Sequence, residues 1–346
     1  MIKSENQPII KSNKYKHLTT AAGFLISIFF LWLTIKSSGL KVRNINIQSE
    51  QLPLFFLSMC CYCLVNYIHS RRARLLWIDL KRNIDTYTGF LIGRFYNSIL
   101  PGQIGEGLRA WHLAQKNNIR FLDALSSLAV EKWLDGVLFI FFIIVFFIIT
   151  PFHNNTLSKG LLFTSVTVFS FSLAFILSIL FKRFSRYIWK QIIKVKFIGL
   201  ISYKLYLHAT QHLIALLRDR RLAVFILVAT IMFMINVLHS CILLHALKIA
   251  FPHYGVYASF LISVTLMIIG MIPSAPSNVG VMHFGLYSAL IAARENLGLP
   301  VNNTDLEQFA IFTFYFHFSI LIPDLLLGSI AVLKDRNWLF QYRDQA

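Results

Sequence analysis

The chain has 346 residues, of which 56% are hydrophobic and only 14% are charged, and its formal net charge is +18. Soluble domains carry about 25% charged residues, so this composition excludes a water-soluble fold and predicts an integral membrane protein. The basic residues lie in short stretches between apolar blocks rather than in a binding domain. This layout disfavours nucleic acid as a partner and favours anionic lipid headgroups.

Six apolar blocks are long enough to cross the roughly 30 Å hydrocarbon core of a bilayer as helices. They cover residues 18–35, 52–69, 124–150, 160–181, 222–247 and 308–333. The first block follows a basic tail, 1–17, and has no small-residue cleavage site after it, so we expect an uncleaved span rather than a signal peptide. The cysteines are interpreted as core residues because they all lie inside apolar blocks. They are Cys60, Cys61, Cys63 and Cys241.

Two further segments, 84–123 and 256–294, are moderately apolar but are interrupted by Gly, Pro and polar residues. The first contains Pro101-Gly102-Gln103-Ile104-Gly105 and the second contains Pro276-Ser277-Asn278-Val279-Gly280. Both runs read Pro-x-amide-aliphatic-Gly. Pro and Gly interrupt helices, and irregular backbone is tolerated at membrane depth only where protein or a watery cavity satisfies it. Each segment is therefore predicted to be a broken, re-entrant hairpin.

The distribution of Lys and Arg predicts the orientation of the chain. The most basic regions are 1–17, 70–83, 182–221 and 334–346. The positive-inside rule places these regions, and therefore both termini, in the cytoplasm. We expect 182–221 to lie on the inner leaflet as an amphipathic segment.

With this orientation, residues 18–150 and 151–333 each read span, span, broken hairpin, span, and the second half is upside down relative to the first. The predicted fold is an all-α integral membrane protein with six full transmembrane helices and two re-entrant hairpins arranged as an inverted repeat. Inverted repeats with broken helices at matching positions are typical of transporters, which bind substrate where the repeats meet.

The breaks supply the candidate substrate-binding residues, because a helix that begins there has free N–H groups and a positive dipole end that attract anions. The candidates are Asn97, Pro101, Gly102, Gly105, Glu106, Arg109, Pro276, Asn278, Gly280 and His283. Glu106 and Arg109 lie three residues apart and share a helix face. They form either an internal ion pair that locks the hairpin or a site in which Glu106 orients Arg109 toward a lipid phosphate.

Charged residues within the predicted spans are candidates for proton transfer or ion pairing, since a charge at bilayer depth costs about 2.5–3.5 kcal/mol on insertion scales. They are Glu131, Lys132, Asp135, His317 and Asp324. Glu131 and Asp135 either carry protons or pair with Arg94 or Arg109. For Asp324 we expect His317 or His283 as the partner.

The run from Asn97 to Ala110, together with Glu131-Lys132-Trp133-Leu134-Asp135, resembles the lysylphosphatidylglycerol synthase transmembrane region, whose members are also called flippase-like domain proteins. The run from Ile272 to Val281 is similar to the second motif of that family, but Ser277-Asn278 replace glycines, His283 stands where Glu is usual and Lys132 stands where Arg is common. The resemblance implies the lipid-translocating region standing alone, without an aminoacyl-transferase domain.

These observations predict a flippase-like transporter of the cytoplasmic membrane that moves an anionic or lipid-linked headgroup between leaflets. The expected partners are anionic phospholipids or isoprenoid-linked lipids. No phosphate-binding loop, nucleophile elbow or metal-ligand spacing occurs in the sequence, so neither an enzyme nor a cofactor or metal is expected. Two alternatives remain: a membrane-embedded transferase acting on a lipid-linked substrate, and an accessory subunit of a lipid or envelope synthesis system.

Overall fold

The computed structural model of the protein describes residues 13–39, 49–77, 85–149, 155–181, 185, 187, 189–191, 196–218, 220–249, 255–270 and 274–335. These residues form helices joined by short connections, and they include no strand. The all-α prediction is therefore confirmed for the described chain. The predicted tails 1–17 and 334–346 lie partly outside the described residues, as do Ile272 and Pro273 of the second motif.

Each predicted span is a helix. The six are α1 (Asn13–Ser38), α2 (Leu52–Ala73), α5 (Phe121–Ile149), α6 (Asn155–Leu180), α9 (Arg221–Ala246) and α12 (Asn303–Lys334). Four described helical stretches are long and apolar enough to cross a membrane: Ser49–Leu76, Leu162–Leu180, Arg221–Ala246 and Asn303–Lys334. The other two helices, α1 and α5, have 26 and 29 residues. The total of six membrane spans stays a prediction.

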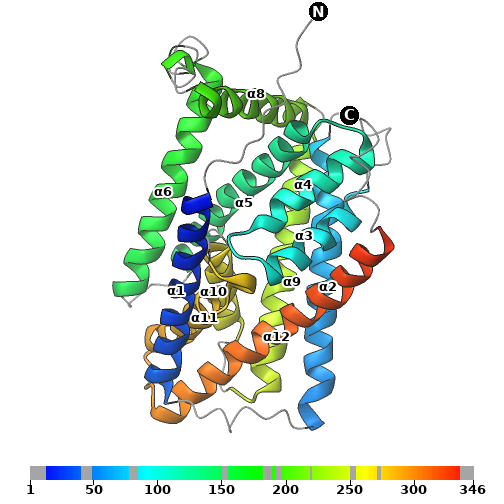
Figure 1. The fold of residues 1–346 in the computed structure, drawn as a ribbon. Coiled ribbons are helices and arrows are strands. Elements are labelled where there is room, and N and C mark those ends of the chain that lie inside the picture. The colour runs from blue at the N-terminus through cyan, green and yellow to red at the C-terminus, as the bar shows by residue number, and fades with distance from the viewer. Residues whose placement is uncertain are drawn as a thin grey trace, which may run out of the picture.

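The long helices form two sets that run in opposite directions. In Figure 1, α1, α5 and α9 run downward, whereas α2, α6 and α12 run upward. The first half of the chain therefore reads down, up, hairpin, down, and the second half reads up, down, hairpin, up. We call the end of the bundle where α2 ends and α5 begins the upper end, as it is drawn in Figure 1.

Both broken segments are helical hairpins. The first consists of α3 (Tyr87–Ile99) and α4 (Ile104–Asn117), and the second consists of α10 (Gly255–Ile269), the short η4 (Pro276–Asn278) and α11 (Val281–Asn296). The backbone is left-handed at Gly102 and Gln103 in the first tip and at Ser277 and Asn278 in the second. The Pro- and Gly-containing runs thus mark the positions where each helix is interrupted, because a regular helix cannot continue through left-handed residues.

The two hairpins enter the bundle from opposite ends, and their tips meet inside it (Figure 1). The backbone N–H of Gly102 donates to the carbonyl oxygen of Ser274 at 3.0 Å. The Gln103 side chain donates to the carbonyl oxygen of Gly270 at 2.7 Å. These two hydrogen bonds satisfy backbone groups that would otherwise be unpaired in the middle of the protein.

Packing on the neighbouring helices holds each hairpin in place. The first packs against α12 and α5, and the second packs against α9, α12 and α1. The core of the lower half is aromatic, with the rings of Phe142 on α5 and Phe233 on α9 stacked at 3.9 Å between centroids. Phe146 stacks on Phe260 of α10 at 5.2 Å and connects α10 to the same cluster.

Gly105 lies where the two arms of the first hairpin cross most closely. A Cβ atom there would overlap the carbonyl oxygen of Gly93 and would lie 2.6 Å from Oδ1 of Asn97, whereas a Cβ at Gly107 would meet nothing within 4 Å. We therefore expect Gly105→Ala to destabilise the protein strongly and Gly107→Ala to leave it unchanged, since overpacking costs about 1–3 kcal/mol or more. Thermal unfolding of the two detergent-solubilised variants measures this difference, and equal midpoints would contradict it.

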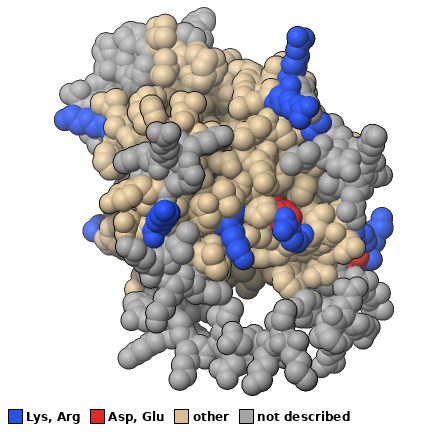
Figure 2. All heavy atoms as spheres, turned by 90° about the horizontal axis from the view of Figure 1, so that it is seen from above, with Lys and Arg blue, Asp and Glu red and all other residues tan. Residues whose placement is uncertain are grey.

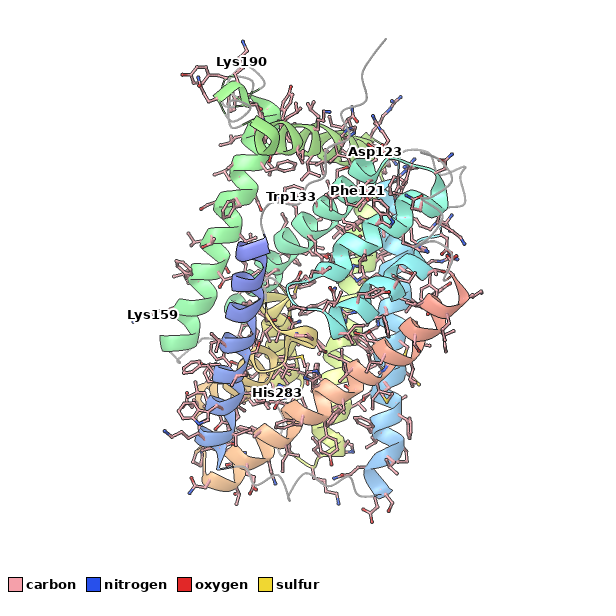
Figure 3. All side chains as sticks on the ribbon, in the orientation of Figure 1. Phe121, Asp123, Trp133, Lys159, Lys190 and His283 are labelled. Atoms are coloured by element: carbon pink, nitrogen blue, oxygen red, sulfur yellow. The ribbon has the colours of Figure 1, made fainter. Side chains whose placement is uncertain are left out.

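The upper end is basic. The helix α8 (Lys196–Arg218) lies across this end and packs against α5 (Figure 1). Figure 2, which views the molecule from above, shows Lys and Arg side chains at several places on this face and few Asp or Glu. Exposed basic residues near this end are Arg71, Lys116, Arg120, Lys190, Lys204, Arg218 and Arg220. Lys190 is labelled at the top of Figure 3.

Candidate functional site

A cavity of about 720 Å³ lies where the hairpin tips meet. Both tips contribute to its lining, through Asn97, Gln103 and Glu106 of the first hairpin and through Ser277 and Asn278 of the second. The remaining walls come from α2, α5, α9, α10, α11 and α12, with one residue from α8. The lining of the cavity therefore combines both halves of the chain.

One part of the cavity lining carries a polar cluster around Asp324. Arg94 Nε lies 3.3 Å from Oδ2 of Asp324. The Tyr62 hydroxyl lies 3.0 Å from each carboxylate oxygen, and the Asn66 amide donates to Oδ1 at 3.4 Å. Arg94 also donates to the Tyr62 hydroxyl. Asp324 is buried, so these donors replace the water that would otherwise solvate its charge.

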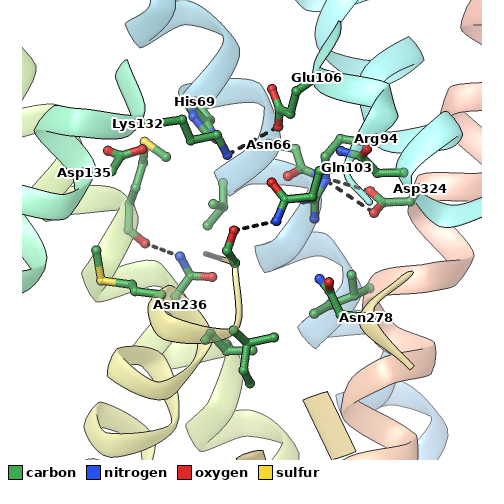
Figure 4. A pocket seen from close by; sticks show the side chains of 18 of the residues that line it. Asn66, His69, Arg94, Gln103, Glu106, Lys132, Asp135, Asn236, Asn278 and Asp324 are labelled. Carbon is green, nitrogen blue, oxygen red and sulfur yellow. Dashed lines mark hydrogen bonds and ion pairs between the residues drawn. The ribbon is translucent and has the colours of Figure 1, made fainter. Parts of the chain in front are cut away.

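Two further ion pairs line the same cavity. Lys132 Nζ lies 3.3 Å from a Glu106 oxygen and connects α5 to the first hairpin. Arg72 forms two hydrogen bonds with the Asp135 carboxylate, at 2.6 and 3.0 Å, and connects α2 to α5. Figure 4 shows Lys132, Glu106, Arg94 and Asp324 around the opening between the helices. Each of the three cations in the lining thus faces a carboxylate.

A buried pair behind this wall holds the first hairpin to α5. Arg109 Nη2 lies 3.0 Å from Oε2 of Glu131, and their side chains are 2% and 1% exposed. His69 of α2 also contacts Glu131, and the Arg109 guanidinium lies over the Phe90 ring, 4.9 Å from its centroid. Both charges are removed from solvent, which costs free energy. The attraction between the two groups offsets this cost only because they are close and well aligned.

His69, Glu131 and Asp135 offer ligand atoms that lie within 4.8 Å of one another, a spacing that would suit a metal ion. The guanidinium of Arg72 already lies at this position, 2.6 Å from Asp135 and 3.8 Å from Glu131. Arg109 neutralises the other side of Glu131. A positive side chain therefore takes the place that a metal ion would need, and the group is a set of ion pairs.

Apolar residues of α5, α9 and α10 also line the cavity, and they are Leu128, Ala129, Leu138, Phe142, Ala229, Met232, Phe233, Leu266 and Met267. The same helices contribute the polar residues Lys132, Asp135, Asn236 and Ser263. The cavity lining thus combines charged and hydrogen-bonding groups with hydrocarbon side chains.

The structure separates the predicted site residues into two groups. Those that line the cavity are Asn97, Glu106, Lys132, Asp135, Asn278 and Asp324, and those outside its lining are Pro101, Gly102, Gly105, Arg109, Glu131, Pro276, Gly280, His283 and His317. Arg109 is 1% exposed. Of the two interpretations of Glu106 and Arg109, the structure favours an internal lock, because Arg109 lies 3.5 Å from Glu106 and closer still to Glu131.

The N-terminus of α4 is not an open anion site. The backbone N–H of Gly105 donates to Oδ1 of Asn97 at 2.8 Å, and Glu106 places a carboxylate in the first turn of the helix. The hydrogen bond to Asn97 satisfies a free N–H group of the helix, and the Glu106 carboxylate offsets the positive end of the helix dipole. An anion would therefore find little unneutralised charge at this tip.

The prediction that Asp324 pairs with a histidine is wrong. Its partners are Arg94, Tyr62 and Asn66. His283 and His317 instead contact each other, with ring centroids 4.9 Å apart. His317 also contacts the Ser277 hydroxyl at 3.0 Å. Figure 3 places His283 in the lower half of the bundle. The two histidines therefore support the second hairpin tip.

Sequence reasoning missed most of the contribution of α2. Tyr62, Asn66 and His69 all line the cavity, although the span that contains them reads as a plain apolar block. Their spacing of four and then three residues places them on one helix face. A polar stripe at this spacing inside an apolar span was the signal that could have revealed them.

The family described as the lysylphosphatidylglycerol synthase TM region matches residues 20–328, which is most of the chain. The chain belongs to this family. No curated protein and no solved structure matches it. Membership of this family and the long apolar helices together establish a multi-pass membrane protein of the lysylphosphatidylglycerol synthase TM region. The matched residues include both hairpins and every residue of the cavity wall described above.

Proposed function

We propose that this protein moves a lipid between the two leaflets of the cytoplasmic membrane. The observation that carries the proposal is the amphipathic cavity, because it lies where two broken hairpins from opposite ends of the bundle meet. In transporters built from inverted repeats, the substrate binds at such a meeting point. A cavity lined by both polar and apolar groups suits an amphipathic substrate better than a soluble one.

The basic upper end supports an orientation with that end in the cytoplasm, as the positive-inside rule requires. With this orientation, both hairpins are re-entrant and approach from opposite leaflets. The cavity lining reaches toward the upper end at Leu125 and Leu205. At the other end of the cavity, the second tip packs on α1, where Ser27 Oγ accepts a hydrogen bond from the Ala275 N–H at 3.1 Å. These features support a state that receives lipid from the cytoplasmic leaflet.

Rocking of the repeats would transfer the headgroup to the other leaflet. The tips are joined by the two hydrogen bonds from Gly102 and Gln103, and each such bond contributes only about 0.5–1.5 kcal/mol. These contacts are weak enough to break and re-form during transport. In this role the protein acts as a transporter and leaves the lipid chemically unchanged.

Reconstitution into liposomes tests the proposal. Vesicles carry lipids with a fluorescent acyl chain, and a membrane-impermeant quencher reports how much label has reached the outer leaflet. We expect the protein to increase the rate of exchange well above that of protein-free vesicles, with or without a pH gradient. If no lipid class exchanges faster than in empty vesicles under either condition, the proposal is refuted.

A further inference from the structure

Carboxamide side chains surround the cavity from several directions. They are Asn66 on α2, Asn97 on α3, Gln103 at the first tip, Asn236 on α9 and Asn278 at the second tip. Hydroxyl groups of Ser98, Ser263, Ser274 and Ser277 belong to the same lining. Figure 4 shows four of these amides, Asn66, Gln103, Asn236 and Asn278, around one space. The lining therefore contains more neutral hydrogen-bonding side chains than side chains of either charge.

The protein uses only part of the hydrogen-bonding capacity of these amides. Asn236 donates to the Met232 carbonyl of its own helix at 3.0 Å, and among the described residues its amide oxygen has no partner. Asn278 accepts from the Ser274 hydroxyl at 2.5 Å, which leaves its NH₂ group available. The Gln103 NH₂ donates to Gly270, which leaves its oxygen available. The cavity thus presents both donors and acceptors to a ligand.

The charges of the lining, by contrast, are already neutralised. Its three guanidinium or ammonium groups, Arg72, Arg94 and Lys132, pair with Asp135, Asp324 and Glu106, and the three positive and three negative charges cancel. An anionic headgroup would have to displace a carboxylate from its cation or approach that carboxylate closely, and like charges at close range repel strongly in a low-dielectric site. The capped N-terminus of α4 adds no free positive charge.

We propose that the cavity recognises an uncharged, hydroxyl-rich headgroup, namely a sugar. This inference rests on the proposed function and specifies its substrate class. Each sugar hydroxyl both donates and accepts hydrogen bonds, which matches the available amide NH₂ groups and oxygens around the cavity. A site built to hydrogen-bond its substrate strongly rejects an analogue that lacks those groups. The apolar lining residues accommodate the lipid chain next to the sugar.

A comparison of lipid headgroups in the same proteoliposomes tests the inference. Three probes carry the same fluorescent chain label: a hexosyl diacylglycerol, an isoprenyl hexoside without phosphate, and phosphatidylserine. We expect at least one sugar probe to exchange about tenfold faster than phosphatidylserine, a factor that corresponds to about 1.4 kcal/mol. The probe that is faster distinguishes the diacylglycerol tail from the isoprenoid tail. Exchange of phosphatidylserine at an equal or higher rate overturns the sugar assignment but keeps the proposed function, whereas exchange of no probe overturns both.

A matched pair of variants on α9 locates the recognition. Asn236→Leu removes an amide from the cavity lining, while Thr230→Val removes a hydroxyl outside it, and within the described chain each side chain donates to a carbonyl of its own helix. We expect Asn236→Leu to slow sugar-lipid exchange by about tenfold, equivalent to about 1.4 kcal/mol, and to leave phosphatidylserine exchange unchanged. Thr230→Val should change neither rate. If Asn236→Leu slows both lipids equally, or neither of them, the assignment is wrong.

Discussion

Replacing Arg109 with alanine is expected to lower the free energy of unfolding by about 3–5 kcal/mol, which is the usual cost of leaving one partner of a buried ion pair alone. The substitution would leave the Glu131 carboxylate, 1% exposed, without its closest guanidinium. Arg72 lies 3.8 Å away and is already bound to Asp135, so it compensates only in part. Thermal unfolding of the solubilised protein, followed by size-exclusion chromatography, measures the loss.

A surface pair provides the control for this experiment. Arg120 and Asp123 are 2.9 Å apart, but Arg120 is 74% exposed, and exposed pairs contribute about 0–1 kcal/mol. Arg120→Ala should therefore leave the unfolding midpoint almost unchanged. The double variant Arg109→Met/Glu131→Met should be more stable than either single variant, because it removes both buried charges together. A stable Arg109→Ala protein would show that this pair does not hold the first hairpin.

Asp324→Asn is expected to reduce lipid transport by about tenfold or more, equivalent to about 1.4 kcal/mol, while folded protein is still recovered. Asparagine keeps the size of the side chain but removes the charge that organises Arg94, Tyr62 and Asn66. The Arg94 side chain is 32% exposed, so the cavity can solvate the charge that is left over and the fold should survive. Arg94 would then be free to move, and the polar wall would lose its shape.

The control for Asp324 lies on the same helix. Asp305 pairs with Arg294 at 2.5 Å near the beginning of α12, outside the cavity lining. Asp305→Asn also removes an arginine–aspartate pair, and transport per folded molecule should be preserved. The exchange rates of the two variants in proteoliposomes, normalised to protein recovered, decide the question. Equal rates would mean that the Asp324 cluster has only a structural role.

The sequence allowed the helices and their interruptions to be predicted because both depend on local properties. The apolar block 18–35 became α1, Asn13–Ser38, and the run Pro101–Gly105 coincided with the interruption between α3 and α4. Block length follows from bilayer thickness, and Pro and Gly interrupt helices wherever they occur in a span. No knowledge of neighbouring helices was needed for either prediction.

Partners across the bundle could not be predicted in the same way. Asp324 pairs with Arg94, which lies 230 residues earlier in the chain, and Arg72 pairs with Asp135. Arg72 reads as a basic residue next to a cytoplasmic loop, yet its side chain is 2% exposed. Spacing within one helix shows which residues share a face, but it does not show which helix that face contacts. The contact between the two hairpin tips could not be predicted for the same reason, because the sequence does not show which elements pack against each other.

Reversible cross-linking of the two hairpin tips tests the central claim most directly. Gln103→Cys and Ser274→Cys are introduced after Cys60, Cys61, Cys63 and Cys241 have been replaced, and a short thiol-reactive linker, cleavable by reduction, bridges the tips. A monofunctional reagent of the same chemistry controls for added bulk. We expect the cross-link to stop lipid exchange and reduction to restore it. If cross-linked protein exchanges lipid as fast as the unlinked protein, the tips do not separate during transport and the account is wrong.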